Sequence, residues 1–109
     1  MEASTYIAAI DRNMKIFEVF RALDIEMPIG QILFFLHAAK HEGASLREIA
    51  ELSDTVMSTA SRYLGNLSIY RRDKKPGLKL LTSRVHPENR AKLTIELTEK
   101  GRLVLQQLM

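Results

Sequence analysis

The sequence contains no cysteine and no tryptophan, and it lacks any apolar run of about 18 residues, the length that a membrane-spanning helix requires. Without cysteine the protein forms no disulfide and offers no thiolate to zinc, which fits a reducing compartment. The N-terminus, MEASTYIAAIDRN, has neither the basic start nor the apolar core of a signal peptide. We therefore expect a cytoplasmic protein without a membrane span.

Motifs for catalysis are also missing. The sequence shows no phosphate-binding loop, no glycine-rich dinucleotide turn and no Ser-His-Asp spacing. His37 and His41 stand four residues apart on one expected helix, but no third His, Cys or carboxylate joins them on that face, so a structural role is favoured over a metal site. We expect no enzyme activity, no cofactor and no metal.

The most informative segment, residues 45–62, predicts two short helices joined by a tight turn. Ser45 and Glu48 have the spacing of a capping box, which starts a helix over residues 46–52. A second helix is expected over residues 56–67, because apolar residues recur there at spacings of three and four, namely Met57, Ala60, Leu64 and Leu67. This arrangement is typical of a helix-turn-helix.

The opposite face of the second helix carries residues suited to reading DNA: Ser58, Thr59, Ser61 and Arg62. Short hydroxyl side chains let a helix approach base edges closely, and Arg donates two hydrogen bonds to guanine O6 and N7. The second helix is therefore expected to be a recognition helix.

A β-hairpin is expected next. Residues 78–85 contain a leucine-rich, β-prone run, and residues 91–97 alternate apolar and polar side chains. Pro87 and Asn89 favour a turn between the two strands. A hairpin after a helix-turn-helix is a wing, and Thr98 is expected to cap a final helix over residues 98–108.

These motifs resemble the winged helix-turn-helix of MarR-type bacterial transcription regulators. The resemblance covers roughly residues 28–109 and rests on IAEL, STASR and HPENRAKLTIELTEKGRLVLQQL, of which LTEKGR with its upstream wing is the most specific. It implies a recognition helix in the major groove and a wing-tip Arg in the minor groove. Asn89 and Ala91 stand where the family pattern has Asp and Arg, so either Arg90 serves the wing or the wing binds only backbone.

The resemblance also bears on the subunit arrangement. Family members carry long terminal helices that pack against a partner subunit, and this chain has only about one helix after the wing. Resembling regulators often form a small-molecule effector pocket between these helices and the DNA-binding lobe, but no residue of this sequence identifies one.

Basic residues gather on the expected DNA-binding side, although the net charge is only +3. Between residues 62 and 92, Lys and Arg outnumber the two acids, Asp73 and Glu88. A charged run alone is more often a solvated face, but next to a helix-turn-helix and a wing it indicates phosphate binding. The expected DNA contacts are Ser45, Thr55, Ser58, Thr59, Ser61, Arg62, Arg71, Arg72, Lys74, Lys75, Arg84, His86, Asn89, Arg90 and Lys92.

The N-terminal helix, expected over residues 4–23, is apolar on more than one face. Either it packs wholly within its own domain or part of it meets the same helix of a second subunit, and the second reading is favoured because a small domain offers few partners. The expected dimerisation residues are Tyr6, Ile10, Phe17 and Phe20. A core helix follows over residues 28–42, starting at Pro28 and ended by Gly43 in a left-handed conformation.

The sequence thus predicts a single domain over residues 1–109, mainly α with a small β-hairpin. The predicted function is that of a homodimeric double-stranded DNA-binding transcription regulator, a repressor, from a bacterium or its phage. Two alternatives stay open: a phage or plasmid DNA-architectural or replication protein with the same fold, and a protein-interaction module that has lost DNA binding.

Overall fold

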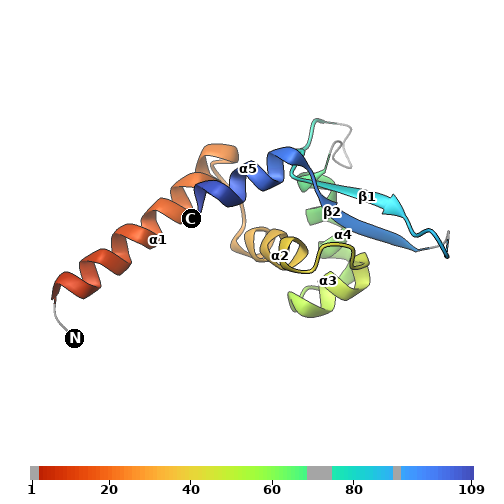
Figure 1. Cartoon of the computed structure of the whole chain (residues 1–109), viewed down its shortest axis with the longest axis horizontal. Coiled ribbons are helices and arrows are strands. Elements are labelled where there is room, and N and C mark those ends of the chain that lie inside the picture. The colour runs from red at the N-terminus through yellow and green to blue at the C-terminus, as the bar shows by residue number, and fades with distance from the viewer. Residues whose placement is uncertain (1–2, 69–74, 90–91) are drawn as a thin grey trace.

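The computed structural model describes residues 3–68, 75–89 and 92–109. The described elements are α1 (Ala3–Leu23), α2 (Ile29–Lys40), α3 (Leu46–Leu52), α4 (Met57–Leu67), β1 (Leu81–Val85), β2 (Leu93–Leu97) and α5 (Glu99–Gln107). Helices α2, α3 and α4 form a compact group beside the hairpin, while α1 projects away from it (Figure 1). The predicted mainly helical class with one hairpin is confirmed.

Helix α2 is shorter than predicted. It begins at Ile29 with Pro28 as its N-cap and ends at Lys40, with His41 as its C-cap. Gly43 does adopt a positive φ of 95°. Its N–H donates to the carbonyl of Ile95 on β2 and does not cap the helix. The chain after Lys40 therefore pairs with β2, and α2 ends before the predicted residue 42.

The helix-turn-helix matches the sequence closely. Ser45 and Glu48 form the predicted capping box at the start of α3. In the turn, Asp54 has a φ of 52°, a conformation that Asp tolerates better than most residues. The N–H of Thr55 then donates to the carbonyl of Ala50, which turns the chain toward α4.

The wing is an antiparallel pair in which Leu81 faces Leu97 and Val85 faces Leu93. The first strand begins at Leu81, not at residue 78, because Lys79 has a φ of 61° that interrupts an extended strand. On its other edge, β2 pairs with the segment before α3, through a bridge between Ser45 and Thr94. This third sheet segment was not predicted from the sequence.

Burial along β2 follows the predicted alternation at Ile95 and Leu97 but departs from it at the wing end. Leu93 is exposed, whereas Thr94 is buried where β2 bridges to Ser45. The Thr94 hydroxyl donates to the carbonyl of Arg84, which satisfies it inside the sheet.

The core lies between α2, the helix-turn-helix and the sheet, and the C-terminal end of α1 packs against it. Its largest fully buried apolar side chains are Phe20, Phe34, Phe35, Ile49, Leu67, Leu80, Leu81 and Ile95. The rings of Phe20 and Phe35 meet edge to face, with centroids 6.1 Å apart. Phe20 is only 1% exposed, so its predicted place in a dimer interface is wrong: it joins α1 to the core of its own domain.

Helix α5 returns along α1, which brings the C-terminus beside the middle of that helix (Figure 1). Thr98 caps α5 as predicted, accepting from the Gly101 N–H at 3.0 Å. A Cβ on Gly101 would lie 2.3 Å from the carbonyl oxygen of Leu80, so only glycine allows this close packing of α5 on the wing root. Among the described residues, no helix combines the length and the apolar character needed to cross a bilayer.

Candidate nucleic-acid interface

Helix α4 presents one buried and one open face. Ala60, Tyr63 and Leu67 are buried against α2 and α3. Of the predicted base-reading residues, Ser58 and Arg62 are exposed, whereas Thr59 and Ser61 are half-buried. The structure therefore keeps Ser58 and Arg62 available to a ligand along the open side of the helix.

The buried stripe of α4 differs in part from the predicted one. Met57 is exposed and Leu64 is only partly buried, whereas Tyr63 is 9% exposed. Tyr63 tilts against the ring of Phe34, with centroids 6.1 Å apart, and its own ring lies 5.9 Å from the guanidinium carbon of Arg62. The guanidinium of Arg62 thus lies within the range of a cation–π contact with Tyr63.

Two predicted contact residues are engaged within the helix-turn-helix itself. The Ser45 hydroxyl accepts from the Glu48 N–H at 3.2 Å as part of the capping box. The hydroxyls of Thr55 and Ser53 lie 2.9 Å apart, and that of Ser53 also donates to the carbonyl of Ile49. These hydroxyls form hydrogen bonds that stabilise the helix-turn-helix itself.

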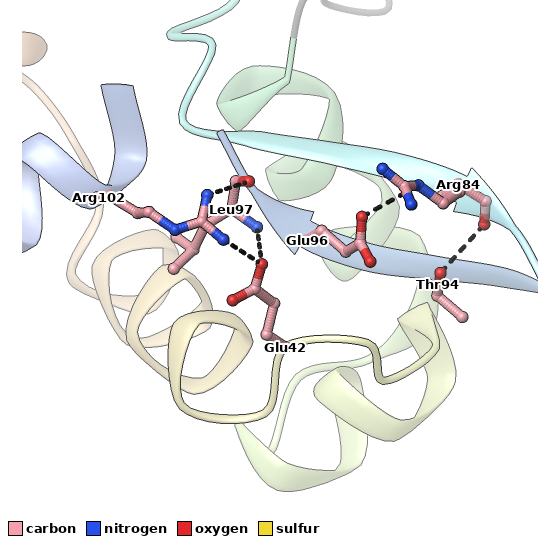
Figure 2. A network of polar contacts seen from close by, with 6 residues as sticks. All are labelled: Glu42, Arg84, Thr94, Glu96, Leu97 and Arg102. Carbon is pink, nitrogen blue, oxygen red and sulfur yellow. Dashed lines mark hydrogen bonds and ion pairs between the residues drawn. The ribbon is translucent and has the colours of Figure 1, made fainter. Parts of the chain in front are cut away.

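Two basic residues of the wing already have acidic neighbours. Arg84 Nε lies 3.2 Å from Glu96 Oε2 across the hairpin (Figure 2), and Lys92 Nζ lies 3.2 Å from Glu48 Oε1 on α3. The hydrogen bond from Lys92, followed by those from Ser45, lowers the pKa of Glu48 below its ordinary value. Both pairs are partly exposed, so a phosphate can compete for either cation.

The remaining wing residues cluster at the turn. The Glu88 N–H donates to His86 Nδ1 at 3.1 Å, and the Lys92 N–H donates to the carbonyl of Asn89 at 3.0 Å. Asn89 is exposed and His86 is half-buried. Lys75, which precedes the wing, is also exposed. The other predicted contacts, Arg71, Arg72, Lys74 and Arg90, lie outside the described residues.

Within the described part of the chain, no group of three or more His, Cys, Asp or Glu side chains is placed to hold a metal. The rings of His37 and His41 stack with centroids 6.5 Å apart.

A polar cluster that was not predicted from the sequence lies at the root of the wing. Glu42, Leu97 and Arg102 meet there although they come from three separate segments (Figure 2). The sequence signal was the LTEKGR element, whose first and last residues are Leu97 and Arg102; nothing in the sequence pointed to Glu42.

The fold can be compared with solved structures. A crystal structure of MarR aligns with a TM-score of 0.64 at 18% sequence identity, over 97% of this chain and 72% of that one. This is the MarR-type winged helix-turn-helix fold. The S. aureus MepR–DNA complex gives a TM-score of 0.68 at 20% identity, over 96% and 78% of the two chains.

A further MarR-type neighbour is BpsR of Bordetella bronchiseptica, whose DNA binding is regulated by 6-hydroxynicotinic acid. It aligns with a TM-score of 0.60 at 16% identity, over 96% of this chain and 75% of that one. No family model matches the chain, and no curated protein matches it in sequence. The resemblance of the sequence to MarR-type regulators is thus confirmed at the level of the fold.

Proposed function

We propose that the protein is a sequence-specific, double-stranded DNA-binding transcription regulator that acts as a repressor in the cytoplasm. The observation that carries this proposal is the open face of α4. That face offers Ser58 and Arg62 to a ligand on a fold shared with a regulator solved in complex with DNA.

In this proposal α4 enters the major groove, where Arg62 donates to a guanine edge and Ser58 approaches a neighbouring base. Arg84 and Lys92 leave their carboxylate partners for phosphates, with His86 and Asn89 at the turn of the wing. Lys75 and the basic residues outside the described ranges, Arg71, Arg72 and Lys74, add phosphate contacts before the wing, and Arg90 serves its tip.

We further propose that the protein forms a homodimer through α1. Helix α1 exposes Tyr6, Ile7, Ile10, Met14 and Phe17, each to more than half of its surface. These positions repeat at spacings of three and four, so they form one apolar stripe that a second copy can cover. Two copies joined in this way would read an inverted repeat whose half-sites lie about one helical turn, ~10 bp, apart.

Selection of bound duplexes from a random DNA library tests the proposal. We expect an inverted repeat to be enriched, and the same sequence to occur at promoters that the protein represses in the cell. Recovery of duplexes without a common sequence would indicate an architectural role, and binding to no duplex would favour a protein-interaction module.

A further inference from the structure

Three residues close a ring of hydrogen bonds at the root of the wing. The Leu97 N–H donates to Glu42 Oε2 at 3.2 Å, and Arg102 Nη1 donates to the Leu97 carbonyl at 3.1 Å. Arg102 Nη2 completes the ring by donating to Glu42 Oε2 at 2.9 Å (Figure 2). We call Glu42, Leu97 and Arg102 the wing-root ring.

The wing-root ring supplies hydrogen-bond partners to the edge of β2 at a position where no neighbouring strand does so. Ile95 pairs along the outer edge of β2, where its carbonyl accepts from the Gly43 N–H and its own N–H donates to the Ala44 carbonyl. Leu97, two residues further on, presents its N–H and carbonyl to the same edge. The chain opposite is already turning into α2, so the carboxylate of Glu42 and the guanidinium of Arg102 act in place of a strand.

The ring also connects three elements of the fold, α2, β2 and α5. Glu42 follows α2, Leu97 ends β2 and Arg102 lies in the first turns of α5. Helix α5 packs on α1, and Lys15 Nζ on α1 donates to the Met109 carbonyl. At its other end, β2 leads to the turn of the wing and to Lys92, the partner of Glu48. The ring is therefore a joint between the wing, the α1–α5 pair and the end of α2, the helix that packs on α4.

We propose that Glu42 and Arg102 are positioning residues that fix the direction of the wing relative to α4. They act through the backbone of Leu97, without touching DNA themselves. This inference rests on the proposed function. Their side chains are 35% and 53% exposed, and a partly exposed ion pair contributes little to global stability, so its loss should loosen the wing without unfolding the domain.

The test is a double-mutant cycle of Glu42→Ala and Arg102→Ala, with Lys100→Ala on the exposed surface of α5 as the matched control. Affinity is measured for the duplex selected by the wild-type protein and for a random duplex. Each single variant should lose about tenfold in affinity for the selected duplex and less than twofold for the random one. The double variant should be no worse than either, because both changes break one ring.

Two conservative variants separate positioning from the loss of a charge. Glu42→Gln keeps an oxygen that accepts from Leu97, so it should recover part of the affinity. Arg102→Lys keeps the charge but cannot donate to two acceptors in the same fork, so it should behave like Arg102→Ala. Additive losses, or equal losses on the selected and random duplexes, would overturn the inference.

Wing orientation is measured without DNA by residual dipolar couplings of the β2 amides relative to those of α4. The couplings should show one fixed orientation in the wild type and Lys100→Ala, and averaging in Glu42→Ala, at a temperature where each variant is folded. Unchanged couplings in Glu42→Ala would overturn the positioning role. A wild-type protein that binds no duplex would contradict the proposed function alone, since the couplings still decide the role of the ring.

Discussion

Lys92 on the wing and Glu48 on the first helix of the helix-turn-helix lie 3.2 Å apart, measured from Nζ to Oε1. The same carboxylate accepts from the N–H of Ser45, at the start of α3. One side chain therefore caps a helix and holds the wing against it. A cation that a DNA phosphate would attract is thus already placed beside the helix-turn-helix.

The pKa of Glu48 should report this contact. Because the hydrogen bond from Lys92 is the largest cause of its lowering, Lys92→Met should raise the pKa of Glu48 part of the way to its ordinary value. A folded-state pKa below the unfolded one stabilises the fold above the unfolded pKa, and this contribution is lost as the pH falls through the folded pKa. NMR titration of the Glu48 carboxyl carbon measures the shift, and an identical pKa in both proteins would show that the pair does not form in solution.

Arg62→Ala should weaken binding to the selected duplex by ~1–3 kcal/mol and relax the base preference at one position of each half-site. The reason is that Arg62 is exposed on α4 and is the cation that we propose to read a base. Competition binding with single-base variants of the duplex measures both effects, and Arg12→Ala on the exposed surface of α1 is the control. An equal loss on random duplex would assign Arg62 to a phosphate instead.

Glu96→Gln should strengthen DNA binding and make it more sensitive to salt. The change removes the partner of Arg84, which lies 3.2 Å away, and frees that guanidinium to neutralise a phosphate. The slope of log affinity against log salt should steepen by up to about one unit. Glu26→Gln, in the turn between α1 and α2, removes the same charge away from the wing. If the two variants change the slope equally, Arg84 is not at the interface.

Phe17→Asp should separate the subunits while leaving the domain folded. Phe17 is 52% exposed on α1, so a new carboxylate there costs little in a monomer but several kcal/mol in an apolar interface. Sedimentation velocity should show a dimer for the wild type and a monomer for the variant. The affinity of the variant for the operator should fall by more than the loss of a single contact in one half-site would cause. A wild-type monomer at micromolar concentration that binds a single half-site at full affinity would exclude the proposed dimer.

Phe20→Ala should instead destabilise the domain itself. Phe20 is 1% exposed and packs on Phe35, so its truncation leaves a cavity that costs ~3–5 kcal/mol in the free energy of unfolding. Urea denaturation of Phe17→Ala and Phe20→Ala, both made monomeric by dilution, measures the difference. Equal destabilisation would contradict the separate places assigned to the two rings.

The sequence by itself determined the features that depend on neighbours along the chain. The Ser45–Glu48 capping box, the Thr98 cap and the limits of α3 follow from hydrogen bonds within one helical turn, and each was predicted correctly. The winged helix-turn-helix order followed in turn, because a hairpin that follows two such helices is a wing. At this level the residues close in sequence are also the residues in contact.

Only the tertiary structure decided which apolar and charged residues find partners far away in the chain. Phe17 and Phe20 have the same side chain on the same helix, yet one is exposed and the other buried, because Phe35 of α2 covers only one side of α1. The strand expected from residue 78 starts at Leu81, since the amides of Leu78 and Leu80 bond to carbonyls at the end of α4. The wing-root ring likewise joins Glu42 to Arg102 across 60 positions of sequence. No local pattern encodes such pairs, because their energy depends on packing that exists only once the elements have met.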